Sequence, residues 1–253
     1  MKNALRHLPH LLPRIRKNGF LLMLDFDGIL APIVVHPERA RMSARTRRLL
    51  AACARRGRVA VISGRALADV RSRVSLRRIW YAGNHGAEWA MGAARGQARP
   101  SRATAAQLRD AKRAFTELVQ RYPGAVVEDK KITFSVHFRG LARTRIPRFK
   151  KDAVRLARAF IRLLDIAEGS EYIFNVRGRS GRTKGSAVHL ARQAAPRRMV
   201  AIYVGDDTTD EDAFRALPHG ITIRVGKRAK SSARFCIRNR SEVDSILAVL
   251  AAI

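Results

Sequence analysis

Short apolar runs alternate along this chain with segments in which apolar residues recur at helical spacing. The apolar runs have the length of strands, and they occupy Phe20–Asp25, Val59–Ile62, Ile79–Ala82, Met199–Val204 and Ile221–Val225. Helical spacing is found in Ser43–Gly57, in the stretch through Val70, and in Gly185–Gln193, Asp210–Leu217 and Val243–Leu250. Nearly continuous apolar strands that alternate with amphipathic helices predict an α/β fold, with a parallel sheet covered by helices on both faces.

The middle of the chain has a different pattern. Val126–Val127 and Lys131–Phe138 alternate polar and apolar residues, as half-exposed antiparallel strands do. Helical patterns at Ala103–Tyr122 and Pro147–Leu164 and a short strand at Glu171–Val176 complete the region. Because strand–helix alternation resumes afterwards, we predict a small α+β domain at 103–176, inserted into a core domain made of 1–102 and 177–253.

The charge balance narrows the possible partners. The 253 residues include 51 Lys and Arg against 20 Asp and Glu, a formal net charge of +31, and the sequence pI is ≈ 11.7. The arginines are spread over the whole length, and aromatic residues, on which bases could stack, make up only 6% of the chain. We interpret the charge as a general arginine bias that favours anionic substrates, and we expect no specific nucleic-acid partner.

No segment predicts a secreted or membrane protein. The apolar run near the N-terminus is interrupted by Pro13, Arg14 and Arg16, too early for a signal peptide. No run approaches the ~18 apolar residues that a membrane span needs. Cys53 and Cys236 lie far apart without metal-ligand spacing, as expected of buried thiols in a reducing compartment. We therefore predict a cytoplasmic protein, and we expect it to be a monomer.

Two aspartates follow the first apolar run. In LLMLDFDGIL, Asp25 and Asp27 are one residue apart, and Gly28 permits the chain to turn at once. The ligand crevice of an open α/β sheet lies at the carboxyl ends of its strands. Two carboxylates this close repel each other unless a cation neutralises them, and hard oxygen ligands suit Mg²⁺. The pair therefore predicts a magnesium site.

Three further strand or helix ends carry polar groups. Ser63 follows the second apolar run, where its hydroxyl and the adjacent amides suit a phosphate oxygen. Lys184 lies at the mouth of a helix, where the helix dipole and the ammonium group both favour an anion. The segment GDDTTDED after the fourth apolar run crowds carboxylates that suggest a metal, among them Asp206, Asp207 and Asp210.

This ordered set of Asp-x-Asp, Ser, Lys and Gly-Asp-Asp resembles the haloacid dehalogenase superfamily of phosphotransferases, from about Phe20 to the C-terminus. The resemblance implies a Rossmann-like parallel sheet core with an inserted α+β cap. It also implies that Asp25 is the nucleophile and that Asp27 is the general acid and base. Ser63 would hydrogen-bond the transferred phosphoryl group, and Lys184 would neutralise its charge.

The same resemblance implies a ligand set for Mg²⁺. The ion would be held by the carboxylate of Asp25, the backbone carbonyl of Asp27 and the carboxylate of Asp206. Asp207 and Asp210 would be weaker candidates that support these ligands. The ion is needed because a carboxylate that attacks a phosphate dianion meets charge repulsion.

Longer segments indicate the subfamily. LDFDGILAPIVVHPERA, YAGNHGAEW, VEDKKITFSVHFR and GDDTTDEDAF together resemble the trehalose-6-phosphate phosphatases. That family hydrolyses trehalose 6-phosphate to trehalose and phosphate with Mg²⁺, through a phosphoaspartyl intermediate. By the resemblance, Glu128 and Lys130 of the cap bind sugar hydroxyls, and Asn84 and His85 line the core side of the cleft. Arg65 either steers phosphate or decorates its loop.

The chain departs from the family pattern at two positions. Ile29 replaces the usual threonine after Asp-x-Asp-Gly, which predicts a modest loss of rate. Asn175 replaces a glutamate before the lysine motif. If that glutamate contacts the sugar in the family, we expect Asn175 to keep a polar contact without the charge. Two alternatives stay open: a capped phosphatase for another sugar phosphate, such as sucrose 6-phosphate or a mannosyl phosphate, and a basic nucleic-acid-binding protein on a degenerate phosphatase scaffold.

Overall fold

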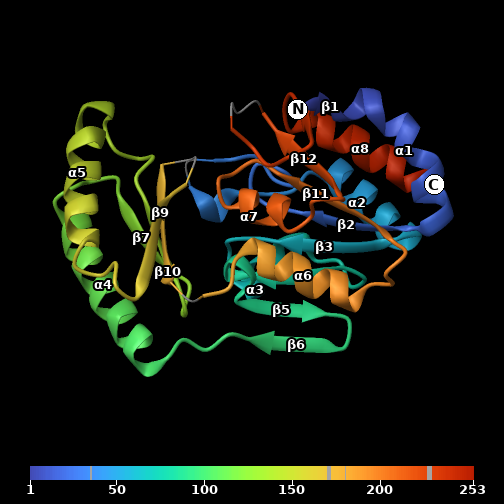
Figure 1. Cartoon of the computed structure of the whole chain (residues 1–253). Coiled ribbons are helices and arrows are strands. Elements are labelled where there is room, and N and C mark those ends of the chain that lie inside the picture. Colours follow the sequence, from blue (N-terminus) through green and yellow to red (C-terminus); the bar gives the residue numbers. More distant parts are fainter. Residues whose placement is uncertain (35, 170–171, 180, 227–229) are drawn as a thin grey trace. The chain divides into compact units, whose positions relative to one another are not determined.

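The computed structural model describes residues 1–34, 36–169, 172–179, 181–226 and 230–253. These residues form two compact units. The core unit consists of Met1–Gln97 and Arg182–Ile253, and the insert unit consists of Ala98–Gly181. Each unit has its own sheet, of nine strands in the described part of the core unit and of four in that of the insert unit (Figure 1).

The core sheet has the strand order β1-β13-β12-β11-β2-β3-β4-β5-β6. Its strands are Lys2–Asn3 (β1), Phe20–Leu24 (β2), Arg58–Ile62 (β3), Trp80–Gly83 (β4), Glu88–Met91 (β5), Ala94–Gln97 (β6), Val200–Gly205 (β11), Ile221–Val225 (β12) and Phe235–Ile237 (β13). Neighbouring strands from β1 to β4 are parallel, whereas β5 and β6 add an antiparallel hairpin that the sequence patterns did not predict. Because β2 pairs with β11 and β3, its carboxyl end is central in the sheet.

Helices cover both faces of the core sheet, as predicted. One face packs against α1 (Ala4–Asn18), α2 (Ala44–Arg56), α3 (Leu67–Val74) and α8 (Ser241–Ala251), and the other against α6 (Lys184–Ala194) and α7 (Asp210–Arg215). Alternate residues of β2 divide between the two apolar cores: Leu22 and Leu24 belong to the first, Leu21 and Met23 to the second. This pattern is that of a strand buried on both faces.

The insert unit is an antiparallel sheet with helices on one face. Its strands, in the order β7-β8-β10-β9, are Val126–Asp129 (β7), Phe134–His137 (β8), Ile173–Gly178 (β10) and Leu164–Glu168 (β9). Its helices α4 (Arg102–Gln120) and α5 (Ile146–Ala157) bury Phe115 and Phe149 against Phe134 and Phe174 of the sheet. The predicted α/β fold with an inserted α+β domain is confirmed.

Two predicted elements of the insert unit were wrong in extent. The helix predicted to reach Leu164 ends at Ala157, and Leu164 instead begins β9, where it is buried against β10. The strand predicted from Lys131 begins at Phe134, because Lys131 adopts a left-handed φ of 70° in a turn and its N–H bonds the Asp129 carboxylate. The division drawn between 176 and 177 falls inside β10.

The segment before Phe20 forms α1, which the sequence patterns did not predict. Asn3 caps the helix by accepting a hydrogen bond from the backbone of Arg6 at 3.0 Å, and Leu8 is buried in the core. Pro9 and Pro13 lie inside α1, although proline is unfavourable in a helix interior. Among the described helices, none is both long and apolar enough to cross a membrane.

Candidate active site

Asp25 lies at the carboxyl end of β2, where the sequence placed the nucleophile. Its backbone nitrogen continues the pairing with β11 by donating to Val204 O at 3.0 Å. One carboxylate oxygen accepts from the backbone nitrogen of Phe26 and the other from Lys184 Nζ, each at 2.7 Å. The side chain is buried, and the structure brings Asp25 and Lys184 into direct contact across 159 residues of sequence.

Lys184 is the first residue of α6, which begins at the predicted place. Thr183 caps the helix, since its hydroxyl accepts from the Ser186 backbone and the Ser186 hydroxyl accepts from the Thr183 backbone. Besides Asp25, Lys184 Nζ also bonds Asp210 Oδ1 at 2.7 Å. Burial alone would lower the pKa of this lysine, but the two carboxylates raise it above its usual value. The ammonium group therefore stays charged at neutral pH.

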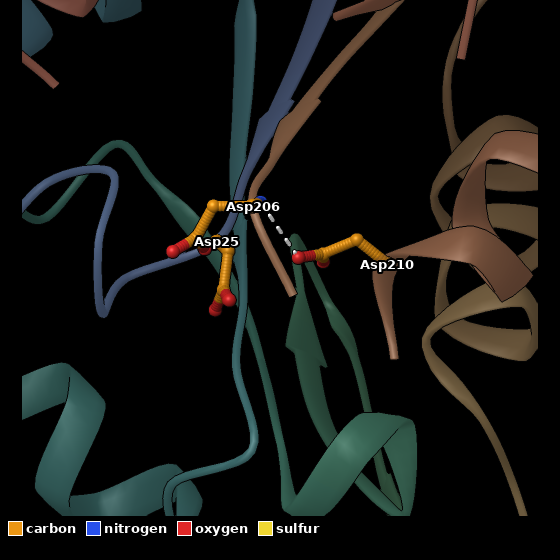
Figure 2. Close-up of side chains that lie close together, drawn as sticks. All are labelled: Asp25, Asp206 and Asp210. Carbon is orange, nitrogen blue, oxygen red and sulfur yellow. Dashed lines mark hydrogen bonds between the residues drawn. The ribbon is translucent and has the colours of Figure 1, made fainter. Parts of the chain in front are cut away.

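Asp210 holds the loop that follows β11. Its Oδ1 accepts a hydrogen bond from the Tyr203 hydroxyl at 2.7 Å in addition to that from Lys184. Its Oδ2 accepts from the backbone nitrogens of Asp206 at 3.0 Å and Asp207 at 2.8 Å, and Figure 2 shows the Asp210 carboxylate directed at the Asp206 nitrogen. Through these four bonds the fully buried Asp210 anchors the loop.

Asp206 approaches Asp25 closely, as Figure 2 shows. One oxygen from each of Asp25, Asp206 and Asp210 lies within 4.8 Å of the other two. Asp206 Oδ1 is buried and has no hydrogen-bond partner among the described residues. A buried oxygen without a described partner, next to a second carboxylate, offers the hard oxygen ligands that a divalent cation takes. These residues therefore fit Mg²⁺.

Burial and neighbouring carboxylates raise the pKa values of two acids in the cluster, Asp25 and Asp206. Burial raises the pKa of Asp25 to about 7; Lys184 opposes the increase, while Asp210 and Asp27 add to it. Burial also raises the pKa of Asp206 well above its usual value, and Asp25 contributes in the same direction. A divalent cation would relieve this repulsion and return both carboxyls to the charged form.

Asp27 is held by Arg65. The guanidinium donates from Nε and one terminal nitrogen to both oxygens of Asp27, each at 2.7 Å, and also bonds Asp69 at 2.9 Å. Arg65 is buried beside the ring of Phe26, whereas the Asp27 side chain is 39% exposed. Arg65 was expected either to steer phosphate or to decorate its loop. In this structure it orients Asp27 instead.

Ser63, Asn84 and His85 meet where β3 and β4 end. Ser63 Oγ accepts from the backbone of Arg65 at 3.1 Å, and Ser63 O accepts from the backbone of His85 at 3.0 Å. Asn84 and His85 both have left-handed φ angles, 49° and 56°, in the short 3₁₀ segment Asn84–Gly86. Consecutive non-glycine residues in this region are strained, which is typical of functional loops.

Glu128, Lys130 and Asn175 lie together in the insert unit, on and beside the sheet face opposite its helices. Lys130 Nζ donates to Ser135 Oγ at 2.7 Å and lies 3.4 Å from a Glu128 oxygen, and Ser135 in turn donates to Asn175 Oδ1 at 2.9 Å. The same Glu128 oxygen lies 2.8 Å from His137 Nε2. We call these five residues the polar row. Their hydroxyl, amide and charged groups suit recognition of a sugar.

Two other predicted positions have local partners. The Asp207 carboxylate accepts from the hydroxyls of Thr208 at 3.3 Å and Thr209 at 3.1 Å, and Asp207 is not in the group of three acids that could share an ion. Ile29, which replaces the family threonine, is fully buried in the apolar core.

Sequence reasoning missed two residues that support the site. Tyr203 bonds Asp210, as described, and Arg224 bonds the backbone carbonyls of Asp206 and Asp207. Arg224 is paired with Glu211 at 3.1 Å. Both residues stand inside buried strands, β11 and β12, and a polar side chain in a buried strand is a signal that it has a specific partner.

Known proteins resemble the chain over most of its length. Residues 23–242 match the family model described as trehalose-phosphatase. A trehalose-phosphate phosphatase of Mycobacterium bovis is 39% identical over 210 residues, which cover 81% of this chain and 53% of that protein. The chain thus spans about half the length of the curated relatives that it matches.

Solved structures share the fold. The C-terminal domain of the Candida albicans trehalose-6-phosphate phosphatase superposes with a TM-score of 0.86 at 20% identity, over 97% of this chain and 96% of that one. A sugar phosphatase of haloacid dehalogenase subclass IIB superposes with a TM-score of 0.57 at 15% identity, over 92% of this chain and 100% of that one.

Proposed function

The chain belongs to the trehalose-phosphatase family, and on that premise we propose that it hydrolyses trehalose 6-phosphate to trehalose and phosphate. The observation that carries the proposal is the convergence of Asp25, Asp206 and Lys184 at the carboxyl end of the central strand. This arrangement supplies a nucleophilic carboxylate and a fixed cation next to it. Both are needed to transfer a phosphoryl group.

Asp25 is the proposed nucleophile. One of its oxygens forms a bond to phosphorus while the bond from phosphorus to the sugar oxygen breaks, which leaves an aspartyl phosphate. Lys184 keeps one Asp25 oxygen fixed at 2.7 Å and places a positive charge beside the transferred group. Ser63, whose hydroxyl lies in the adjacent loop, is the proposed hydrogen-bond donor to a phosphoryl oxygen.

Asp27 is the proposed acid and base. It gives a proton to the sugar oxygen as that oxygen leaves, and then takes a proton from the water that attacks the aspartyl phosphate and releases phosphate. Arg65 fixes the plane of the Asp27 carboxylate through two parallel bonds, while the exposed part of the side chain can exchange protons with solvent.

Mg²⁺ is the proposed cofactor, with the carboxylates of Asp25 and Asp206 as its protein ligands and Asp210 as the anchor of the Asp206 loop. When bound, the ion neutralises charge between the attacking carboxylate and the phosphate dianion. We further propose that the polar row of the insert unit binds glucosyl hydroxyls, so that this unit acts as the substrate-recognising cap.

The decisive experiment is a phosphate-release assay over a panel of sugar phosphates. We expect trehalose 6-phosphate to give the highest kcat/KM, Asp25→Asn to abolish turnover, and a chelator to do so reversibly. Asp244→Asn, on α8, is the control and should keep full activity. Higher activity on sucrose 6-phosphate or a mannosyl phosphate would replace the proposed substrate, and normal turnover by Asp25→Asn would refute the nucleophile.

A further inference from the structure

A cavity of the core unit lies at the end of the sheet opposite the candidate active site. Its volume is about 840 Å³, and of the eighteen described residues that line it seven are arginine and none is acidic. In the chain as a whole, 51 of 253 residues are Lys or Arg and 20 are Asp or Glu. The lining is therefore about twice as rich in basic residues as the chain.

Several elements contribute these arginines. Arg55 and Arg56 end α2, and Arg58 begins β3. The other four lie in α3, in the turn before β4 and in β6: Arg71, Arg77, Arg78 and Arg95. Seven exposed arginines from separate elements thus line one hollow, which a single charged helix face would not produce.

Among the described residues, no anionic group pairs with these guanidinium groups. None of the seven arginine side chains forms a hydrogen bond or ion pair with another described residue. Arg58 lies over the ring of Trp80 at 5.9 Å, and Arg71 lies over the ring of Tyr81 at 6.0 Å. These contacts orient two of the cations without neutralising them, so the positive potential of the cavity is not compensated from within.

The cavity is separate from the candidate active site. Arg58 is the first residue of β3, and Ser63 follows the last residue of the same strand. A strand rises about 3.3 Å per residue, so the two positions are about 17 Å apart. Likewise, Trp80 is the first residue of β4 and lines the cavity, whereas Asn84 follows the last residue of β4 and lies at the candidate active site.

We propose that this cavity binds a small polyphosphate anion. The planar guanidinium fork matches pairs of phosphate oxygens, and several phosphate groups would offset the mutual repulsion of seven cations. The volume falls within the range of about 300–1,000 Å³ that is typical of small-molecule sites. A nucleic acid would instead require a basic groove that follows the backbone over several nucleotides, beyond a single cavity of this size.

Trp80 allows a direct binding test. The chain has two tryptophans, and the second, Trp89, lies under Arg182 and does not line the cavity. In a Trp89→Phe background, Trp80 is the single reporter. We expect tripolyphosphate, titrated in metal-free buffer of low ionic strength, to change its fluorescence saturably with one-to-one stoichiometry. The affinity should fall at least 10-fold in Arg77→Gln/Arg78→Gln.

A matched control distinguishes binding in the cavity from general attraction of the anion by the protein's positive charge. Arg102→Gln/Arg109→Gln removes the same two charges from exposed positions on α4 of the insert unit, and it should leave the affinity unchanged. Equal loss of affinity in the two double variants would overturn the proposal. Arg95→Gln provides a second disruption from another strand, in case the first variant melts at a lower temperature than its background.

Two further ligands distinguish the source of the phosphates. Adenosine triphosphate that binds more tightly than tripolyphosphate, with the same dependence on Arg77 and Arg78, would support the proposal and identify a nucleotide as the ligand. A single-stranded oligonucleotide that binds more tightly than either, and is weakened equally by both double variants, would replace the proposed cavity with a nucleic-acid surface.

Discussion

Asp25 illustrates a conflict between function and stability at a single residue. A nucleophilic carboxylate must be charged, yet burial raises the pKa of Asp25 from its ordinary value of 3.8 to about 7 in the metal-free protein. Between those values the folded state holds a proton that the unfolded chain has released. The free energy of unfolding therefore falls as pH rises through this window, and the loss is complete above pH 7.

Asp25→Asn should consequently stabilise the metal-free protein at alkaline pH. The variant keeps the shape of the side chain but cannot carry the unfavourable charge. We expect its free energy of unfolding to exceed that of the wild type by about 1–2 kcal/mol near pH 8, and the difference to shrink toward pH 5. Thermal melts in chelator across this range would measure the effect.

Asp69→Asn is a control for which we expect the opposite change in stability. Burial acts to raise the pKa of Asp69, but hydrogen bonds from Arg73 and Arg65 outweigh it and lower the pKa. Its charge therefore stabilises the folded state at neutral pH, and the variant should melt at a lower temperature than the wild type there. If Asp25→Asn behaved in the same way, the attraction of Lys184 would outweigh the burial of Asp25.

Arg65 tests whether the orientation of Asp27 matters to the proposed reaction. Arg65→Lys replaces a two-pronged contact with a single ammonium group, so that the Asp27 carboxylate loses its fixed plane. We expect kcat on trehalose 6-phosphate to fall about 10- to 100-fold, within the range of a misplaced acid–base group. On an aryl phosphate, whose leaving group needs no proton, the fall should be smaller.

Arg73→Lys is the matched control for Arg65→Lys. Arg73 bonds Asp69, as Arg65 does, but it does not touch Asp27. It should therefore affect stability and leave the ratio of the two activities unchanged. Equal losses on both substrates in Arg65→Lys would show that Arg65 acts on the phosphoryl group, which is one of the two alternatives left open by the sequence, and not through Asp27.

At the scale of elements, the turn after β2 governs how closely two loops approach. Gly28 has a φ of +75°, and a Cβ at this position would lie 2.0 Å from Asp206 Oδ2. Gly28→Ala should therefore displace Asp206 as well as strain the turn. We expect a loss of at least about 2 kcal/mol in stability and at least a tenfold weaker affinity for Mg²⁺ by calorimetry.

Gly226 is a glycine with a similar positive φ but with space beside it. Its φ is +78°, and no atom of the described residues lies within 4 Å of a Cβ built there. Gly226→Ala should cost only the conformational strain, about 1 kcal/mol, and leave metal affinity unchanged. Similar metal affinities in the two variants would mean that Asp206 moves aside without consequence for the ion.

Elements also show what the sequence could predict. Asp25, Ser63 and Asp206 were identifiable because parallel strands bring their carboxyl ends to one edge, so linear position is sufficient. The Arg65–Asp27 contact depends on the path of a loop, which no periodicity encodes. Helix α1 was missed because Pro9 and Pro13 act as helix breakers in short peptides, whereas here packing of Leu8 and Ile15 compensates.

At the scale of the whole molecule, the proposed function divides between two units with separate cores. The core unit carries the residues proposed for chemistry, and the insert unit carries the polar row. Within that row the buried Lys130 is held by Ser135 and faces Glu128, so its charge is already positioned before any sugar binds. Pre-positioned polar groups lose little entropy on binding, which favours selectivity for a particular sugar.

Glu128→Ala should therefore change selectivity more than chemistry. We expect kcat/KM for trehalose 6-phosphate to fall at least tenfold, while hydrolysis of a small aryl phosphate falls less than twofold, because the aryl group makes no use of the polar row. Asp129→Ala is the matched control: it removes a carboxylate from the next position of β7, whose partner is Lys112 of α4 at 2.7 Å. Equal losses on both substrates in Glu128→Ala would assign Glu128 to the stability of the insert sheet and leave sugar recognition to other residues.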